Sequence, residues 1–348
     1  MRTQVAIVGA GPAGLVLAHL LAAHGIESVV LESRERDYVE RRIRAGVLEQ
    51  GTVDLLHELD LDERLQREGL VHRGIELRFE GTAHRIPLSD LTGGRAITVY
   101  GQQEVVKDLI AARLAAGGEI LFGAEAIGVD DVTSDRPIVR FRHDGEIKTL
   151  EADIVAGCDG SHGVCRSAIP SSMLQVFQKD YPVAWLGVLA EVAPSTDELI
   201  YAYHERGFAL HSMRSPQLSR LYVQCPPDDH LEDWSDDRIW SELHQRFAMD
   251  GWSLAEGPIV DRSITPMRSV ITEPMQYGRL FLAGDAAHIV PATGAKGLNL
   301  AVSDVRVLAS GLVEWYRSGE TELLERYSDT CLRRVWRVEH FSWWMTSM

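Results

Sequence analysis

The chain has 348 residues, of which 45% are hydrophobic and 25% charged, so it is long enough for two domains and too apolar to be dominated by disorder. Its formal net charge of −16 disfavours nucleic acid and anionic membranes as partners, because binding to phosphates relies on clustered lysine and arginine. Any anionic ligand must therefore be held by a local positive site.

The cysteines indicate neither a metal site nor a disulfide scaffold. They are scattered, without Cys-x-x-Cys pairing, at Cys158, Cys165, Cys225 and Cys331. We therefore expect no metal and a cytoplasmic location. The longest apolar run, 14–26, is interrupted by His19 and His24 and falls short of the ~18 apolar residues that span a bilayer, so we expect no membrane segment.

A dinucleotide-binding fingerprint lies at the start of the chain. Residues 5–8 predict a strand, the turn Gly-Ala-Gly-Pro-Ala-Gly follows, and apolar residues then recur at helical spacing. Residues 28–31 predict a second strand, which ends at Glu32. The Glu32 carboxylate can accept hydrogen bonds from a ribose diol but would repel a 2′-phosphate, so we expect FAD or NAD here and not NADP.

Each glycine of this turn has a mechanical role. Gly9 permits the tight turn, Gly11 lets the backbone approach a pyrophosphate, and Gly14 lets the helix pack closely on the strand. The free amides and the positive dipole end at the helix N-terminus favour the phosphates.

A basic cluster follows in this otherwise acidic chain. It consists of Arg34, Arg36, Arg41, Arg42 and Arg44 beside Tyr38. The cluster is a candidate site for a 2′-phosphate and a pyrophosphate, and a solvated helix flank is the alternative.

A β-rich segment interrupts the helical pattern in the second half of the chain. Short strands are predicted at 183–189, 198–203, 208–213 and 221–224. We expect an antiparallel-sheet domain (176–276) inserted into an α/β dinucleotide-binding domain made of 1–175 and 277–348.

Two of these strands flank a loop with an arginine at each end. If the hairpin is symmetric about Gln217, Ser212 lies opposite Tyr222. Arg214 then lies opposite Arg220, and strand alternation places these four side chains on one face. The Arg214 guanidinium can form a bidentate pair with a planar carboxylate, to which the two hydroxyls can also donate. A solvated sheet face with an incidental arginine pair is the alternative.

Two further strand-to-turn motifs decide between FAD and NAD. Residues 154–158 lead into Asp159, and residues 279–283 lead into Gly284-Asp285, after which a glycine-bearing loop precedes a long apolar helix. An acid that hydrogen-bonds a ribityl chain, followed by a helix N-terminus that stabilises negative charge on reduced flavin, suits a flavin and not a nicotinamide. Each motif alone is an ordinary turn, but together they favour FAD.

The motifs GAGPAG, CDGSHG and GDAAH, in this order, resemble those of the single-component FAD aromatic monooxygenases. Further stretches, among them RIRAGVLEQG, YAYHERGFAL, VPATGAKGLNLA and FSWWMTS, extend the resemblance along the whole chain. The resemblance implies a Rossmann-like FAD-binding fold with an inserted substrate-binding sheet. It also implies an enzyme that uses NADPH and O2 to convert 4-hydroxybenzoate into 3,4-dihydroxybenzoate through a flavin C4a-hydroperoxide.

The resemblance implies substrate contacts from the hairpin, from the strand before it and from a loop near the last turn. These residues are Tyr201, Ser212, Arg214, Tyr222 and Ala292, the last in place of a usual proline. The three hairpin residues would hold the carboxylate, and Tyr201 would hydrogen-bond the substrate phenol and draw off its proton. His72 would pass that proton to solvent and titrate near neutrality, whereas without the resemblance it is an ordinary surface histidine.

The implied FAD contacts come from the three turns and their neighbours. They are Gly9, Gly11, Gly14, Glu32, Arg42, Arg44, Gln102, Asp159, Arg220, Asp285, Leu298 and Asn299. Lys296 would favour the anion of reduced flavin, and a solvated loop lysine is the alternative reading of that residue.

Because there is no second complete fingerprint, the nicotinamide must visit a surface cleft. The residues implied for NADPH are Tyr38, Arg42, Arg44, His162, Arg166 and Arg268. Ser33 and Ser161 stand where the family often has an arginine and an aromatic residue, so NADPH is favoured while use of NADH stays open.

Two alternative functions also stay open. One is hydroxylation of another small phenolic acid. The other is a flavin-binding protein or NADPH oxidase that releases peroxide, because family members continue beyond the segment 343–348 and carry a second tyrosine of the phenol relay there. A homodimer is also compatible with the resemblance.

Overall fold

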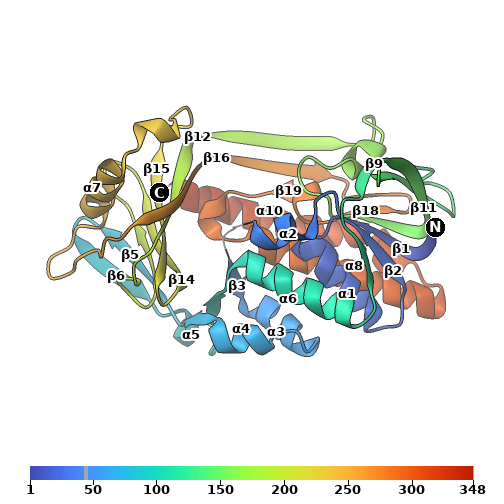
Figure 1. Cartoon of the computed structure of the whole chain (residues 1–348), viewed down its shortest axis with the longest axis horizontal. Coiled ribbons are helices and arrows are strands. Elements are labelled where there is room, and N and C mark those ends of the chain that lie inside the picture. Colours follow the sequence, from blue (N-terminus) through green and yellow to red (C-terminus); the bar gives the residue numbers. More distant parts are fainter. Residues whose placement is uncertain (43–45, 348) are drawn as a thin grey trace.

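The computed structural model describes residues 1–42 and 46–347. Two eight-stranded sheets and a small three-stranded sheet organise this part of the chain. The first large sheet lies at the right of Figure 1 and the second at the left, and the long strands β12 (Gln175–Ala190) and β16 (Ile259–Glu273) run between them. No described helix combines the length and the apolar character needed to cross a bilayer.

The first sheet is the predicted dinucleotide-binding sheet. Its strand order is β17-β18-β11-β1-β2-β8, with β10 and β9 attached to β11. The bounds are β1 (Arg2–Val8), β2 (Ser28–Leu31), β8 (Glu119–Leu121), β9 (Glu125–Asp130), β10 (Ile138–His143), β11 (Glu146–Gly157), β17 (Gln276–Tyr277) and β18 (Leu280–Leu282). Strands β1, β2, β8, β11 and β18 pair in parallel, as expected for an α/β fold.

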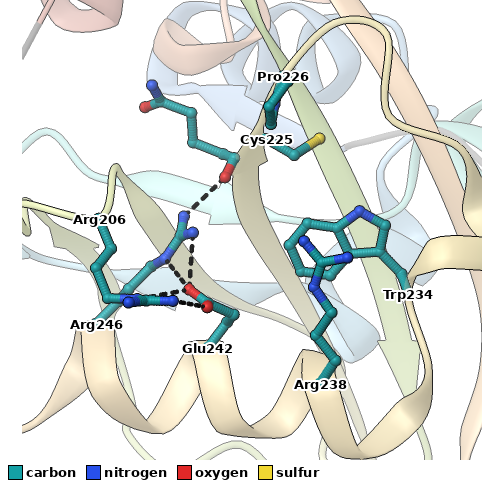
Figure 2. A pocket seen from close by; sticks show the side chains of 8 residues that line it. Arg206, Cys225, Pro226, Trp234, Arg238, Glu242 and Arg246 are labelled. Atoms are coloured by element: carbon teal, nitrogen blue, oxygen red, sulfur yellow. Dashed lines mark hydrogen bonds and ion pairs between the residues drawn. The ribbon is translucent and has the colours of Figure 1, made fainter.

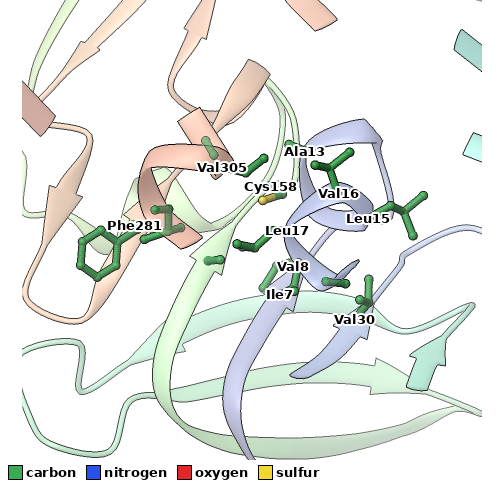
Figure 3. Close-up of a cluster of buried hydrophobic side chains, with 14 of the residues drawn as sticks. Ile7, Val8, Ala13, Leu15, Val16, Leu17, Val30, Cys158, Phe281 and Val305 are labelled. Atoms are coloured by element: carbon green, nitrogen blue, oxygen red, sulfur yellow. The ribbon is translucent and has the colours of Figure 1, made fainter. Parts of the chain in front are cut away.

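The core of this region lies where α1 (Pro12–Ala22) packs on the sheet. Pro12 occupies the first helical position after Gly11, and Leu15 and Leu17 are fully buried. Figure 3 shows Leu17 beside Ile7 and Val8 of β1, with Val305 of α8 (Gly297–Ser318) on the other side of the cluster. Burying side chains of this size stabilises the fold by about 1.5–3 kcal/mol each.

The remaining helices and the small sheet lie around this core, except α7 (Asp236–Phe247), whose buried side chains pack in a separate cluster with the second large sheet. The helices other than α7 are α2 (Arg36–Arg41), α3 (Gln50–Glu58), α4 (Glu63–Glu68), α5 (Leu88–Leu91), α6 (Gln102–Ala115), α9 (Glu322–Glu325) and α10 (Tyr327–Thr346). The small sheet has the order β3-β7-β4, with β3 (Val47–Glu49), β4 (Leu70–His72) and β7 (Ile97–Val99).

The second large sheet contains the predicted β-rich segment. Its order is β19-β16-β12-β15-β14-β13-β5-β6, with β5 (Ile75–Phe79), β6 (Thr82–Ile86), β13 (Leu199–Ala202), β14 (Ala209–Ser215), β15 (Leu218–Cys225) and β19 (His288–Ile289). Within 176–276 all strand pairs are antiparallel, as expected, and the one parallel pair of the described sheet joins β13 to β5, which lies outside that segment. Strands β5, β6 and β19 come from outside 176–276, so flanking segments complete this sheet, and the domain boundaries remain a prediction.

The hairpin register also differs from the expected one. Ser212 lies opposite Arg220 and Leu210 opposite Tyr222, and the register shifts between Met213 and Ser215, at Arg214. Ser215 pairs with Leu218, so the turn holds only two residues and is not centred on Gln217. The extra residue at Arg214 is absorbed as a bulge, which re-aims its side chain.

His211 is a fully buried residue on the other face of β14. Its Nε2 accepts a hydrogen bond of 3.2 Å from the Ser195 amide, while its Nδ1 has no partner among the described residues. Burial, and then the charge of Arg78, lower the pKa of His211 to about 4. The folded protein therefore holds this imidazole neutral at pH 7.

We predict that His211 makes the fold acid-sensitive. Below about pH 6.5 the unfolded chain binds a proton that the folded chain refuses until about pH 4, so stability is lost as pH falls through this window. The expected loss from this group is roughly 2 kcal/mol between pH 7 and pH 5. Urea unfolding of the apoprotein at both pH values should show a smaller loss in His211→Gln, and equal losses in the two proteins would contradict the prediction.

Candidate functional site

The three glycine-bearing turns meet at one edge of the parallel sheet. Val8 of β1 pairs with Gly157 of β11, and Gly157 pairs with Leu282 of β18, so the strands end side by side. The turns that follow them carry Gly9, Asp159 and Gly284. The structure thus brings together segments that are far apart in the sequence, at the edge where α/β sheets bind ligands.

The glycines are required by close approach of the backbone. Gly9 has φ +106°, and a Cβ there would lie 2.3 Å from the Cys158 carbonyl oxygen. A Cβ on Gly14 would lie 2.0 Å from the Gly9 carbonyl oxygen. In contrast, a Cβ on Gly11 would meet no atom within 4 Å, so the N-terminus of α1 is open to a ligand.

The acids of the three turns have different surroundings. Glu32 accepts hydrogen bonds from the amides of Ala10 (2.8 Å) and Arg34 (2.9 Å), so its carboxylate also braces the first turn. Asp159 accepts from the Cys165 amide at 2.9 Å, and its other oxygen is buried without a described partner. Burial raises the pKa of Asp159. Asp285 lies in the short helical turn Gly284–Ala286 with its side chain exposed.

At the start of α8, side chains tie the helix to β3. Asn299 accepts from the Glu49 amide (2.9 Å) and the Thr52 hydroxyl (2.8 Å) and donates to the Val47 carbonyl oxygen (2.9 Å). Its amide also donates to the Ala295 carbonyl oxygen (3.2 Å), so the side chain is saturated by protein groups and Asn299 can meet a ligand only through its backbone. The Lys296 ammonium donates to Glu49 at 2.6 Å, so its charge is partly compensated and it is not a free loop lysine.

The remaining predicted FAD residues surround this edge at different depths. Gln102 begins α6 and is half-buried, as is Leu298, whereas Arg42 is exposed at the end of α2. Arg44 lies outside the described residues. Gln103, which the sequence analysis did not single out, has a buried Oε1 without a described partner.

These groups fit a flavin dinucleotide. The amides at the starts of α1 and α8 are open, because a Cβ on Gly11 or Gly297 would meet no atom within 4 Å. The unpartnered oxygens of Asp159 and Gln103 and the exposed carboxylate of Asp285 can pair with hydroxyl and amide groups. The arrangement can hold phosphates at one end and a polyhydroxylated chain at the other.

An aromatic cluster lines one face of the second sheet. The Trp185 ring stacks on the Phe208 ring, with 5.3 Å between the ring centres, and its centre lies 5.1 Å from that of Tyr222. The ring centres of Phe208 and Tyr201 lie 6.0 Å apart. The Tyr201 side chain is 8% exposed. Burial, and then Tyr222, raise the pKa of Tyr201 to about 12, so its hydroxyl stays protonated at neutral pH.

The hairpin places two arginines beside this cluster. Arg220 is buried, pairs with Asp261 at 3.4 Å and lies over the Tyr222 ring. Arg214 is half-buried, its Nε is shielded from solvent without a partner, and no carboxylate pairs with it among the described residues. Burial lowers the pKa of Arg214. The Ser212 hydroxyl has one long contact of 3.5 Å to the Met213 carbonyl oxygen, so it is nearly free.

His72 is buried, so the alternative of an ordinary surface histidine is wrong. It is 1% exposed, and neither ring nitrogen has a described partner. Burial lowers the pKa of His72 although Glu198 and Asp197 oppose the shift, so its titration moves to the acid side of the expected value. Ala292 lies exposed in the turn Ala292–Gly294, which the Thr293 hydroxyl joins to Thr346 of α10 at 2.8 Å.

The residues predicted for a nicotinamide lie on several elements. Tyr38 is exposed on α2 beneath the Arg34 guanidinium, 5.4 Å from the ring centre. His162 is exposed, Arg166 donates to the Ser161 carbonyl oxygen at 3.0 Å, and Arg268 pairs in register with Asp180 on β16 and β12.

A pocket of about 340 Å³ adjoins the basic cluster. It is lined by Ser33 and Arg34 on one side and by Arg142, His143 and the turn after β10 on the other. Sequence reasoning missed Arg142 and His143, because no motif near them indicates a binding site. Their position next to Ser33 is set by strand pairing distant in sequence.

A second pocket, of about 290 Å³, lies behind the substrate sheet, next to α7 (Figure 2). Glu242 pairs with both Arg206 and Arg246, and Arg246 donates to the carbonyl oxygens of Phe208 (3.0 Å) and Gln224 (2.8 Å). Arg206 and Arg246 therefore share one carboxylate, while Arg238 lies over the Trp234 ring and donates to the Asp233 carbonyl oxygen at 2.7 Å. The Arg246 contact holds the backbone of Phe208, and the ring of this residue stacks on Trp185 in the aromatic cluster.

We predict that a methyl group added at two glycines of the first turn affects two different properties, FAD binding at Gly11 and stability at Gly14. Gly11→Ala should leave the melting temperature of the apoprotein unchanged but weaken FAD binding, because the methyl group occupies open space where phosphate would lie. Gly14→Ala should destabilise the apoprotein itself, by about 1–3 kcal/mol, because its methyl group meets the Gly9 carbonyl. Thermal melts and FAD titration of both variants check this, and wild-type FAD affinity in Gly11→Ala would contradict the phosphate assignment.

Comparisons with known proteins agree with this geometry. The model of the family "FAD binding domain" matches residues 2–342. The chain is 52% identical to p-hydroxybenzoate hydroxylase of Acinetobacter baylyi, over 100% of this chain and 86% of that protein. It is 26% identical to 3-amino-4-hydroxybenzoate 2-monooxygenase of Streptomyces cremeus, over 96% of this chain and 84% of that protein.

Among solved structures, p-nitrophenol 4-monooxygenase PnpA of Pseudomonas putida superimposes with a TM-score of 0.84 at 20% identity, covering 99% of this chain and 90% of that one. This likeness shows a common fold. The predicted fold class and FAD cofactor are confirmed. With the family model spanning the turns at the sheet edge and half of all residues shared with one characterised relative, the chain belongs to the p-hydroxybenzoate hydroxylase family of FAD-dependent aromatic monooxygenases.

Proposed function

We propose that this enzyme hydroxylates 4-hydroxybenzoate to 3,4-dihydroxybenzoate, using NADPH and O2 as co-substrates. The 52% identity to p-hydroxybenzoate hydroxylase supports the reaction. The observation that carries the choice of substrate is Arg214, a half-buried guanidinium beside an aromatic cluster, whose shielded Nε has no partner and with which no described carboxylate pairs.

A benzoate carboxylate would satisfy this guanidinium. A shielded cation without a partner is costly, and a planar carboxylate can pair with a guanidinium through two parallel hydrogen bonds. The nearly free Ser212 hydroxyl can donate to the same carboxylate, and Trp185 and Tyr222 provide an apolar wall for the ring. Tyr201 would then contact the opposite end of the substrate, where the phenol lies.

We predict that Arg214→Met weakens 4-hydroxybenzoate binding by about 3–5 kcal/mol, since removing one partner of a buried charge pair leaves the other uncompensated. Methionine keeps most of the packing volume. Perturbation of the flavin absorbance on titration with 4-hydroxybenzoate measures the affinity. Arg238→Ala, in the pocket next to α7 behind the substrate sheet (the rear pocket), is the control and should bind 4-hydroxybenzoate normally. Wild-type affinity in Arg214→Met would contradict the assignment of Arg214 as the carboxylate-binding residue.

Tyr201 is proposed to activate the substrate. When bound, FAD supplies electron transfer from the nicotinamide and the activation of O2. Tyr201 Oη would accept the substrate's phenolic proton while its own proton leaves towards His72, and the resulting phenolate is more reactive at the ring carbon next to its oxygen. The raised pKa of Tyr201 keeps it protonated between turnovers, and the lowered pKa of His72 leaves a ring nitrogen free to accept.

We predict that Tyr201→Phe uncouples NADPH oxidation from hydroxylation. Product formation should fall on the order of a hundredfold, because proton removal of this kind contributes about 10²–10⁴ to a rate, while peroxide accounts for the NADPH consumed. Product and peroxide are measured per NADPH oxidised in both proteins. Peroxide alone from the wild type would instead support the flavin oxidase alternative, and unchanged product in Tyr201→Phe would refute the role of this residue.

Hydroxylation of a different substituted benzoate is the second candidate function. Similarity to 3-amino-4-hydroxybenzoate 2-monooxygenase favours a hydroxylase of substituted benzoates, and the same carboxylate clamp would serve it. NADPH oxidation stimulated by each of a small panel of hydroxybenzoates and aminobenzoates separates the two candidates.

The nicotinamide, the location and the assembly are also proposals. NADPH would dock beside Tyr38, where Arg34, Arg42 and the pocket at Ser33 can receive a phosphate. A cytoplasmic location is supported by the cysteines, which are buried free thiols. A homodimer is supported by exposed aromatic side chains on β12 and α10, where Phe177 packs edge-on against Trp336 at 5.2 Å.

A further inference from the structure

A buried carboxylate on α8, that of Asp304, accepts hydrogen bonds from both ends of the turn that carries Asp285. Asp304 is 2% exposed, and its Oδ2 accepts hydrogen bonds from the Gly284 amide (3.0 Å) and from His288 Nε2 (2.6 Å). Gly284 precedes Asp285 and His288 follows it by three residues. One oxygen therefore holds the turn at both ends.

The same turn is confined by the two helices whose N-termini face the ligand edge. Gly284 has φ +63°, and a Cβ there would lie 3.1 Å from the Ala301 Cβ on α8 and 3.5 Å from the Ala13 Cβ on α1. The Ala287 amide closes the turn on the Gly284 carbonyl oxygen at 2.8 Å. The turn thus has little room to shift once Asp304 fixes its ends.

The contact between Asp304 and His288 is charge-assisted. Burial disfavours the charged imidazole, but the carboxylates of Asp304 and Asp285 raise the pKa of His288 above its usual value. A protonated His288 donates to Asp304, and such bonds are shorter and stronger than neutral ones. Neither residue reaches the surface, so this pair serves the interior of the fold.

We propose that Asp304 is a positioning residue of the flavin site, which holds Asp285 at a fixed separation from the N-terminus of α8. This inference rests on the proposed contact of Asp285 with the ribityl chain of FAD. Asp304 itself touches neither substrate nor cofactor. Because the α8 N-terminus and Asp285 would contact different parts of one rigid cofactor, their separation governs how tightly FAD binds and how the flavin ring sits.

The test compares Asp304→Asn, His288→Gln, the double variant and Asp285→Asn. Three properties are measured: the melting temperature of each apoprotein, its dissociation constant for FAD by quenching of flavin fluorescence, and the midpoint potential of the bound flavin. Glu242→Gln is the control, because it breaks a buried ion pair of the rear pocket without contact to the turn.

If the hydrogen bonds of Asp304 to Gly284 and His288 (the Asp304 clamp) position Asp285, Asp304→Asn and His288→Gln weaken FAD binding on the order of ten- to a hundredfold and shift the flavin potential. The double variant is then no worse than Asp304→Asn, since both changes break one linkage. Glu242→Gln lowers the melting temperature but leaves FAD affinity and potential unchanged. Should Asp304→Asn not fold, His288→Gln, which removes one arm of the clamp, decides by the same measurements.

Two outcomes would overturn the proposal. Unchanged FAD affinity and potential in Asp304→Asn, with weakened binding in Asp285→Asn, would show that Asp304 only stabilises the fold. Unchanged FAD affinity in Asp285→Asn would refute the ribityl contact and the clamp together.

Discussion

The parallel pairing of β1, β11 and β18 is the constraint on which the rest of this structure depends. Because Val8, Gly157 and Leu282 lie in one register row, the three turns that follow must share a small volume. That volume admits only glycine at Gly9 and Gly14, where a Cβ would lie 2.3 Å and 2.0 Å from backbone oxygens. The glycines, the acids and the two helix N-termini are therefore placed together by the same strand register.

The substrate side depends on a different balance, between burial and charge. The second sheet buries an aromatic face and also shields Nε of the half-buried Arg214 guanidinium, for which the described part of the chain offers no carboxylate. On the rear face, next to α7, Arg206 and Arg246 both pair with the Glu242 carboxylate, so each of these guanidinium groups has a protein partner. The contrast between the two faces of one sheet separates an incomplete site, which needs an anionic ligand, from a complete structural cluster.

Local patterns predicted the first turn, the strand ends and the order of elements, because glycine spacing and apolar periodicity act over a few residues. Local patterns did not predict features that depend on contacts between segments distant in the sequence. The parallel strand β5, the bulge at Arg214 and the burial of His72 depend on contacts between segments more than a hundred residues apart or on how a turn closes. The saturation of Asn299 by Val47, Glu49 and Thr52 was equally hidden, since nothing near residue 299 indicates that β3 packs there.

Strands β12 and β16 belong to the second sheet, yet they extend back to the first, as Figure 1 shows. Their ladder shifts register between Asp180 and Ala184 and again between Leu189 and Ala190, and only the first shift lies between the two sheets. Two long strands bonded along their length resist bending, whereas an interrupted ladder does not. The link between the two sheets is therefore less regular at 181–183 than along the paired stretches on either side.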